Sequence, residues 1–277
     1  MANPIGPLSC AGPWFHRLGP SALAGAARPA SVSLVCFPHA GGAAGTFFQL
    51  ATRLAPDVAV YGVQYPGRQD RLDEPCVDDV VELAESITAE LLKSRSTGVG
   101  AEARPERFAL FGHSMGATVG YEVARRLEPA GLKPLALFAS GRNAPALSGG
   151  RAESPTDDQA LLAEIRELGG TDETVLEDPR YLPLIMPALR ADYRAVRAYR
   201  HQAGPPLACP IVAVVGDADR RVSPDDARFW AAYTTGGFAL RVLPGGHFYL
   251  AEQTDAVARL VADRLARVPA GARAEVV

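Results

Sequence analysis

Residues 111–117 have the sequence FGHSMGA, a GxSxG pentapeptide with one further residue on either side. The apolar run at 107–110 predicts a short strand, and residues 117–127 have the spacing of a helix. A serine on a sharp turn from strand to helix has a strained backbone, and glycines flank it because side chains there would collide with neighbouring elements. This geometry exposes the hydroxyl and leaves the next backbone N–H where negative charge is favoured. The pattern therefore predicts that Ser114 is a catalytic nucleophile.

A nucleophilic serine needs a base, and in proteins with this turn the acid and then the histidine follow it along the chain. Two of the five histidines lie downstream of Ser114, namely His201 and His247. His201 follows an arginine-rich helical stretch and has no loop signature. His247 lies in a Gly-Gly-His loop after the strand-like run at 238–242, from which an imidazole can reach the serine. We predict His247 as the base; a histidine in a surface turn is the alternative interpretation.

The acid is expected at the end of the strand that precedes this loop. The buried-strand run at 210–215 is followed directly by Gly-Asp-Ala-Asp, so that Asp217 and Asp219 are both candidates. An acid that reaches across a loop to a histidine sits slightly beyond the strand end, which favours Asp219. Asp217 is then expected to accept hydrogen bonds from backbone N–H groups of the turn. In this arrangement Ser114 attacks a carbonyl, His247 takes its proton and Asp219 fixes the imidazole tautomer.

An oxyanion needs two donors, and the sequence offers two candidate backbone N–H groups. One belongs to Met115, and the other to the glycine-rich segment at 38–43 that follows the strand-like run at 31–37. Glycines allow the backbone to approach a ligand closely, and Ala40 is the expected donor in this segment. His39 is expected to brace the loop, with a second catalytic group as the alternative. The segment lacks the Lys-Ser/Thr of a P-loop and the spacing of a dinucleotide-binding loop, which argues against phosphate binding.

Five short motifs occur along the chain: FPHAGG at 37–42, QYPGR at 64–68, GHSMG at 112–116, GDAD at 216–219 and GGHF at 245–248. This set, in this order, resembles that of the type II thioesterases. These are discrete α/β-hydrolase editing enzymes of polyketide and nonribosomal peptide biosynthesis. The resemblance extends from about Trp14 to about Leu265, and five motifs together are far more specific than any one of them.

The resemblance implies a fold, an activity and a partner. The implied fold is a mostly parallel central sheet flanked by helices, with a helical lid. The implied activity is that of a stand-alone enzyme that removes aberrant acyl units from the phosphopantetheine arms of acyl or peptidyl carrier proteins, through an acyl-enzyme intermediate. Motif by motif, it implies a site formed by the nucleophile Ser114, the acid Asp219, the base His247 and the oxyanion donors Ala40 and Met115. It also implies that residues 65–68 shape a loop near the site.

The triad alone does not distinguish a thioester from an oxygen ester. A thiolate leaves more readily than an alkoxide because a thiol has a pKa of about 8.5, so thioesters are favourable substrates. A small-ester hydrolase or lipase with the same triad is an alternative function. A non-catalytic, hydrolase-like binding protein is another. Binding alone requires none of Ser114, Asp219 and His247, so the complete set favours an enzyme.

Composition argues against several other classes of function. The net charge of −3 over 277 residues gives no nucleic-acid footprint. No apolar run reaches membrane-spanning length, the N-terminal residues lack the pattern of a signal peptide, and no zinc or calcium spacing occurs. We therefore expect no metal, no cofactor and no membrane or nucleic-acid partner. The four cysteines are widely scattered, and Cys36 and Cys209 lie in or beside strand-like runs, which favours reduced thiols and a cytoplasmic protein.

Alternating strand and helix signals without an internal repeat predict one α/β domain at 14–277, after a disordered tail at 1–13. This alternation of strands and helices stops between 141 and 209, where a helical segment with several prolines is expected to form a lid over an acyl pocket. Within it we expect one helix at 159–168 and another that starts at Pro187 and runs to about 200. The remaining expected elements are an edge strand near Trp14, strands at 58–64 and 134–139, and helices at about 45–55 and about 77–93.

Arg190, Arg194 and Arg197 have spacings of four and three within the second of these helices, and therefore share one face. Carrier proteins of the kind that the resemblance implies are typically acidic. This arginine stripe is therefore a candidate docking site for the carrier protein, and a solvated helix face is the alternative interpretation.

Overall fold

The computed structural model describes residues 12–20, 30–96, 107–147, 157–170 and 176–267. The expected disordered tail at 1–13 lies outside the described residues except for its last two positions.

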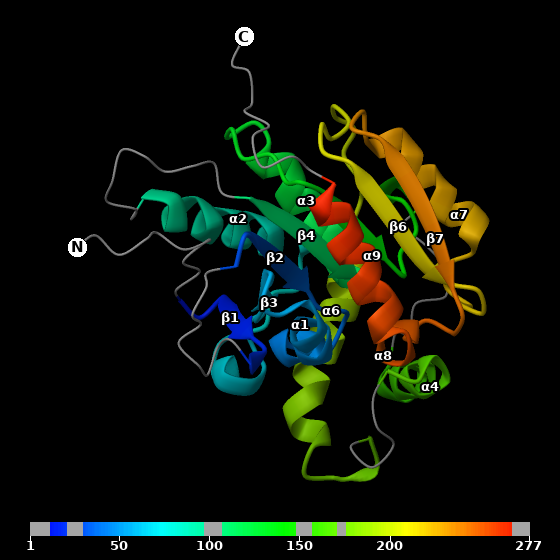
Figure 1. The fold of residues 1–277 in the computed structure, drawn as a ribbon. Coiled ribbons are helices and arrows are strands. Elements are labelled where there is room, and N and C mark those ends of the chain that lie inside the picture. Colours follow the sequence, from blue (N-terminus) through cyan, green and yellow to red (C-terminus); the bar gives the residue numbers. More distant parts are fainter. Residues whose placement is uncertain (1–11, 21–29, 97–106, 148–156, 171–175, 268–277) are drawn as a thin grey trace.

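A seven-stranded sheet forms the centre of the molecule, in the order β1-β3-β2-β4-β5-β6-β7 (Figure 1). The edge strand β1 is antiparallel to β3, and the other neighbouring strands of the described sheet are parallel. The strands are β1 (Phe15–Leu18), β2 (Val32–Phe37), β3 (Val58–Val63), β4 (Phe108–His113), β5 (Leu137–Ser140), β6 (Ile211–Gly216) and β7 (Phe238–Leu243). The predicted class, a mostly parallel sheet flanked by helices, is confirmed.

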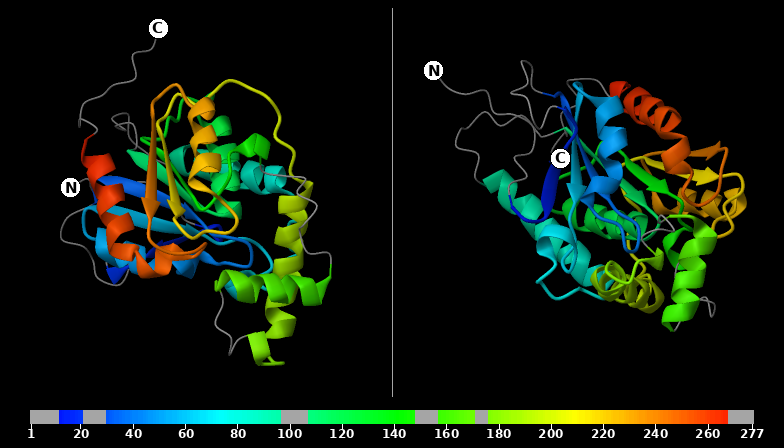
Figure 2. Two further views of the ribbon diagram at one scale, coloured as in Figure 1. Left: turned by 90° about the vertical axis from the view of Figure 1, so that its right-hand side faces the viewer. Right: turned by 90° about the horizontal axis from the view of Figure 1, so that it is seen from below.

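Helices cover both faces of this sheet, as Figures 1 and 2 show. On one face α1 (Phe48–Leu54) and α9 (Thr254–Ala266) share an apolar cluster with the sheet, and on the other α2 (Val80–Ser96) and α3 (Met115–Leu127) share a second. The short helical elements are η2 (Ala44–Phe47), η3 (Gln69–Arg71), η4 (Pro145–Leu147), α7 (Pro224–Arg228), η5 (Phe229–Tyr233) and α8 (Tyr249–Glu252).

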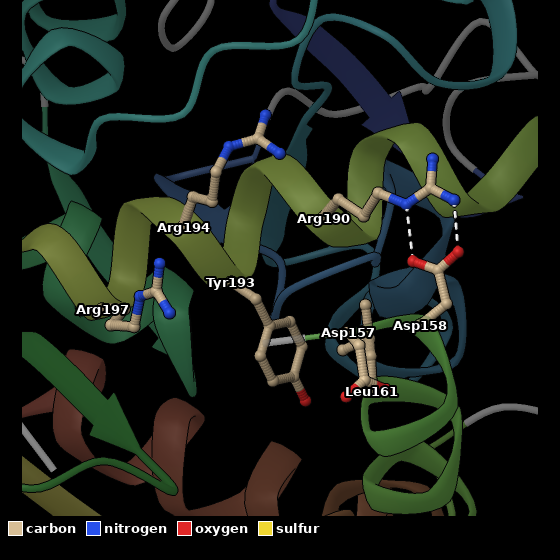
Figure 3. A pocket seen from close by; sticks show the side chains of 7 residues that line it. All are labelled: Asp157, Asp158, Leu161, Arg190, Tyr193, Arg194 and Arg197. Atoms are coloured by element: carbon tan, nitrogen blue, oxygen red, sulfur yellow. Dashed lines mark hydrogen bonds and ion pairs between the residues drawn. The ribbon is translucent and has the colours of Figure 1, made fainter. Parts of the chain in front are cut away.

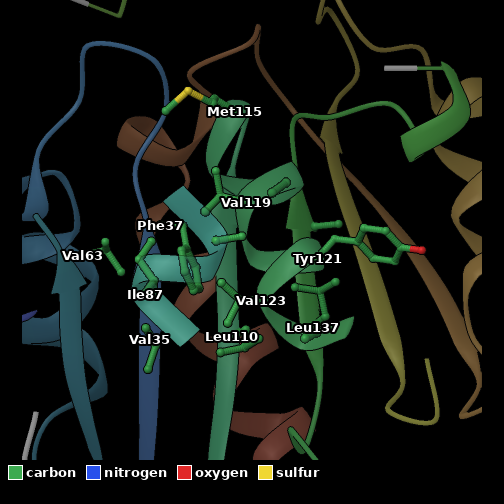
Figure 4. Packing of buried hydrophobic residues seen from close by; sticks show 14 of the residues in the cluster. Val35, Phe37, Val63, Ile87, Leu110, Met115, Val119, Tyr121, Val123 and Leu137 are labelled. Carbon is green, nitrogen blue, oxygen red and sulfur yellow. The ribbon is translucent and has the colours of Figure 1, made fainter. Parts of the chain in front are cut away.

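The inner strands are buried on both faces, which explains their continuous apolar sequences. In β2, Val35 and Phe37 belong to the cluster under α2 and α3, whereas Leu34 and Cys36 belong to the cluster under α1 and α9. Figure 4 shows how Phe37 packs among side chains of β4 and α3. Truncation of such a buried aromatic ring costs about 3–5 kcal/mol, so this core holds the ends of β2 and β4 in place beneath the site.

Among the described residues, two long helices lie between β5 and β6 in the sequence and project beyond the sheet (Figure 2). They are α4 (Asp158–Leu168) and α6 (Leu182–Ala198). A separate apolar cluster joins these helices and is formed by Leu161 and Ile165 of α4, Met186 and Leu189 of α6, and Leu176, which lies between the two helices in the sequence. We call α4, α6 and their connections the helical insertion.

The structure corrects the predicted start of the second helix in this insertion. Pro187 lies inside α6, which begins five residues earlier and has Pro183 in its first turn. A proline inside a helix removes one hydrogen bond to the carbonyl four residues before it, here that of Pro183. The apolar contacts of Met186 and Leu189 with α4 compensate for this loss.

Two other boundaries differ from the sequence prediction for local reasons. The helix expected from about 77 begins at Val80 because the Asp79 carboxylate accepts the N–H groups of Val81 and Glu82 and caps it. The strand expected at 134–139 is β5, which is shorter and ends at Ser140, paired with both β4 and β6.

The described cysteines Cys36, Cys76 and Cys209 are free thiols, and Cys10 lies outside the described residues.

Candidate active site

Ser114 lies on a strained turn between β4 and α3. Its φ of 53° and ψ of −121° belong to no favourable region for a residue with a side chain. The turn is held by a hydrogen bond of 2.8 Å from the Ser114 N–H to the Ser140 carbonyl. A Cβ atom on Gly112 would lie 2.2 Å from the Gly116 carbonyl oxygen, and one on Gly116 would lie 2.0 Å from the Phe37 carbonyl oxygen. Both glycines of the motif are therefore required by close backbone approach.

His247 bridges the serine and an aspartate. Its Nε2 lies 3.0 Å from Ser114 Oγ and its Nδ1 lies 2.9 Å from Asp219 Oδ2. The side chains of His247 and Asp219 are 5% and 0% exposed. The structure thus brings together, from three separate loops, the nucleophile, base and acid that the sequence analysis selected.

The two candidate aspartates have different partners. Besides His247, the Asp219 carboxylate accepts the N–H groups of Arg221 at 2.8 Å and Val222 at 3.3 Å, which fixes its orientation. Asp217 is exposed and accepts the Gly245 N–H at 2.9 Å, in the loop that carries His247. The geometry assigns contact with the imidazole to Asp219 and support of its loop to Asp217.

The two expected oxyanion donors lie on segments that touch each other. Met115 is the first residue of α3, and Ala40 is in the loop after β2. The close approach of Gly116 to the carbonyls of Phe37 and Pro38 brings the start of α3 against this loop. Within the described residues, neither the Ala40 N–H nor the Met115 N–H donates a hydrogen bond, so both are free to bind an oxyanion.

A buried hydrogen-bonded chain that the sequence analysis missed lies behind the triad. The His113 Nδ1 is 2.8 Å from Ser140 Oγ, which is 2.5 Å from the Tyr249 hydroxyl, and that hydroxyl is 3.2 Å from the Val214 carbonyl. Ser140 is the last residue of β5 and Tyr249 is the first residue of α8, and the sequence offers no signal for their pairing. The chain ties the ends of β4, β5 and β6 together beneath Ser114.

Three histidines surround the Phe248 ring, with centroids 4.7 Å away for His39, 5.4 Å for His113 and 5.2 Å for His247. Burial, with smaller contributions from the charges of His247 and Arg68, lowers the pKa of His39 to about 4. Burial also lowers the pKa of His113 well below its usual value. Both rings are therefore neutral at neutral pH.

The loop at 65–68 reaches the site through an ion pair that the sequence analysis did not predict. Arg68 donates to both carboxylate oxygens of Asp192 in α6, at 2.7 and 2.9 Å, and these side chains are 6% and 0% exposed. The Asp192 carboxylate also accepts the Gly41 N–H at 2.7 Å, next to Ala40. In the sequence, the one indication that Asp192 is buried is its place on the same helix face as the apolar residues Leu189 and Ala195.

The arginine stripe lines one side of a pocket of about 280 Å³ between α4 and α6 (Figure 3). Arg190 forms an exposed ion pair with Asp158, and Arg194 forms one with Asp78. In the described part of the chain, Arg197 is exposed and has no ion pair. Most of the positive charge in the stripe is thus offset by neighbouring carboxylates.

The described residues contain no group of three or more histidine, cysteine, aspartate or glutamate side chains placed to hold a metal ion. Within the same ranges, every helix is too short or too polar to cross a bilayer.

Comparison with known proteins shows that this chain is similar to thioesterases. A family model described as a thioesterase domain matches residues 32–265. The thioesterase PikA5 of Streptomyces venezuelae is 44% identical over 255 residues, which make up 92% of this chain and 86% of PikA5.

Two solved structures with similar folds are type II or pathway thioesterases. BorB, the type II thioesterase from the borrelidin biosynthetic cluster, superimposes with a TM-score of 0.78 and 41% identity over 92% of this chain and 98% of BorB. RedJ, a thioesterase from the prodiginine biosynthetic pathway of Streptomyces coelicolor, does so with a TM-score of 0.77 and 41% identity over 85% of this chain and 91% of RedJ.

Proposed function

The chain belongs to the thioesterase family, and from this premise we propose how its serine site acts and on which substrate. Its α/β-hydrolase fold and its similarity to BorB and RedJ identify it as a type II thioesterase of the kind found in polyketide and nonribosomal peptide clusters. The proposed reaction is hydrolysis of acyl thioesters on the phosphopantetheine arm of an acyl or peptidyl carrier protein. Removal of stalled or wrongly loaded acyl groups then frees the carrier protein for another cycle.

We assign the chemistry to Ser114, His247 and Asp219. Ser114 Oγ attacks the thioester carbonyl as His247 Nε2 takes its proton, and the His247 Nδ1–H donates to Asp219 throughout. The tetrahedral intermediate places its negative oxygen toward the N–H groups of Ala40 and Met115. Collapse breaks the carbon–sulfur bond, and the imidazolium protonates the departing pantetheine thiolate.

The second half of the reaction regenerates the enzyme. Water attacks the acyl-Ser114 ester as His247 again accepts a proton, and the returning proton restores the serine hydroxyl. The products are a carboxylic acid and a carrier protein with a free thiol. The observation that supports this assignment most directly is the His247 imidazole within hydrogen-bonding distance of both Ser114 and Asp219.

We also propose that residues 14–277 are one domain in which the insertion at 141–209 is a lid over the acyl group. Two contacts support this. Leu189 of α6 packs against Gly41 in the loop at 38–43, which we call the oxyanion loop. A Cβ on Gly41 would lie 2.3 Å from the leucine side chain. Gly170, directly after α4, packs against Phe248, beside the base.

The proposal is tested by comparing kcat/KM for an acyl carrier protein, for the same acyl group on N-acetylcysteamine and for its ethyl ester. We expect the carrier protein to be the best substrate and the oxygen ester the poorest. An oxygen ester hydrolysed as fast as the carrier protein would favour the alternative, a small-ester hydrolase. Absence of turnover on all three, with correct folding, would favour a binding protein.

A further inference from the structure

Three segments that are distant in the sequence meet at the carboxylate of Asp192. They are the middle of α6, Arg68 in the loop after β3, and Gly41 in the loop after β2. The carboxylate has essentially no exposed surface and accepts three N–H groups, two of them from a bidentate guanidinium. Burial lowers the pKa of Arg68, but the charge of Asp192 and the hydrogen bonds to it have the larger combined effect, so the pKa of Arg68 is raised above its usual value.

We propose that Asp192 is a positioning residue for thioester hydrolysis, one that holds the Ala40 N–H toward the oxyanion by fixing the adjacent Gly41 peptide. This inference rests on the proposed function of the Ser114 site. The Gly41 N–H belongs to the peptide unit that follows Ala40. A hydrogen bond of 2.7 Å to it therefore fixes the plane on the carboxyl side of Ala40.

The rest of the oxyanion loop is held by the same pair and its neighbours. Arg68 Nη1 also donates to the Gly42 carbonyl at 3.1 Å, and the Gly42 N–H donates to the His39 carbonyl at 2.9 Å. The Tyr65 hydroxyl donates to the Pro38 carbonyl at 3.3 Å. The Ala40 N–H lies inside this braced loop and, among the described residues, is left without an acceptor.

Stability alone does not account for an ion pair at this place. Replacing a buried ion pair by apolar side chains of similar size is often neutral or stabilising, because desolvation offsets the attraction between the charges. An apolar pair would, however, leave the Gly41 N–H without an acceptor and the peptide free to rotate. Gly41 has a φ of +77°, and glycine has wide conformational freedom, so an external acceptor is needed to select one orientation.

A matched pair of double variants isolates this hydrogen bond. Arg68→Met/Asp192→Asn and Arg68→Met/Asp192→Leu both remove the two charges together, so neither leaves a lone buried charge. Asparagine and leucine are close in size, but only asparagine offers an oxygen to the Gly41 N–H. With an acyl-N-acetylcysteamine substrate, we expect kcat of the leucine variant to be about 10- to 100-fold below that of the asparagine variant, since small misplacement of catalytic groups costs this much.

Two further measurements separate positioning from general loss of structure. The affinity for an alkylboronic acid, which forms a tetrahedral adduct with the serine, should fall by the same factor as kcat, while KM stays within about threefold. As a stability control, Glu122→Gln weakens the buried network of Glu122 with Arg125 and Arg126 on α3. It should lower the melting temperature and leave kcat near the wild-type value.

Equal kcat and boronate affinity in the two double variants would overturn the inference, and so would a loss confined to KM. If the leucine variant does not fold, Asp192→Glu decides, because it keeps the charge but shifts the carboxylate by one methylene. We expect at least a tenfold loss of kcat from it, and an unchanged kcat would contradict the proposal. Failure of the proposed function has a different signature, in which Ser114→Ala retains the wild-type rate.

Discussion

Replacing Asp219 by asparagine should inactivate the enzyme while leaving its fold intact. The asparagine oxygen can keep the bonds from the N–H groups of Arg221 and Val222, which the carboxylate accepts at 2.8 and 3.3 Å. The amide NH₂ would then face His247 Nδ1, now 2.9 Å from a carboxylate oxygen. An NH₂ group donates, so Nδ1 must accept and the ring proton moves to Nε2, opposite Ser114. The imidazole can then no longer take the serine proton, and kcat should fall by about 10⁴.

The assay is steady-state hydrolysis of an acyl-N-acetylcysteamine thioester, followed by thiol release and accompanied by thermal unfolding. Asp219→Asn should melt within about 4 °C of the wild type, because the change keeps the size of the side chain and its bonds from two backbone N–H groups and costs about 1 kcal/mol. The matched variant Asp217→Ala removes the acceptor of the Gly245 N–H. It should lower the melting temperature by about 2–4 °C, for a loss of about 1 kcal/mol, and retain most activity. A large loss of kcat from Asp217→Ala, with an active Asp219→Asn, would refute the assignment of the acid.

Three more outcomes are expected. Ser114→Ala and His247→Ala should each lower kcat by about a thousandfold or more, and kcat of the double variant should be little lower than that of either single variant. Near-native rates in both single variants would show that the assignment of the triad is wrong. Because burial lowers the pKa of His39 to about 4 from an unfolded value near 6.5, its contribution to stability is complete above pH 6.5 and is lost as the pH falls toward 4. His39→Gln should therefore flatten the decline of melting temperature over this window, and an unchanged slope would contradict a neutral, buried His39. Arg197→Glu should slow hydrolysis of the acyl carrier protein about two- to tenfold, with a weaker salt dependence, and leave hydrolysis of the N-acetylcysteamine substrate unaffected. Arg53→Glu, which breaks an exposed ion pair on α1, makes the same change of charge and is the control. Equal loss of rate on both substrates would exclude docking at Arg197.

The sequence was sufficient for the fold and for the residues of the site that carry motifs. The turn at Ser114 and the Gly-Gly-His loop with His247 depend on local backbone geometry, and glycines next to short apolar runs predict this geometry directly. The strands were predicted well because parallel strands buried on both faces are continuous apolar runs. The predicted start of α6 at Pro187 is wrong because proline is typical of a first helical turn, whereas here apolar packing of Met186 and Leu189 with α4 stabilises the helix on both sides of Pro187.

The sequence does not predict hydrogen bonds and ion pairs between residues that are distant along the chain. Nothing in the residues around Arg68 indicates a partner 124 positions later, and Asp192 occurs among alternating polar and apolar residues of an ordinary amphipathic helix. The same holds for Ser140 and Tyr249, whose 2.5 Å contact spans 109 positions. The arginine stripe was predicted from spacing alone, and spacing does not reveal that Asp78 and Asp158 offset two of its charges.

The contacts of the helical insertion constrain how this enzyme can be re-engineered. Acyl preference is an attractive target for chimeras in which the segment between β5 and β6 is exchanged with that of a relative. Two residues after α4 the segment packs Gly170 against Phe248, and from the middle of α6 it presents Asp192 to Gly41. A transplanted segment that lacks a small residue at the first position or an acceptor at the second would disturb catalysis, whatever acyl chain it was chosen to accommodate. Productive exchange should therefore keep these two positions native and vary the other residues of α4 and α6.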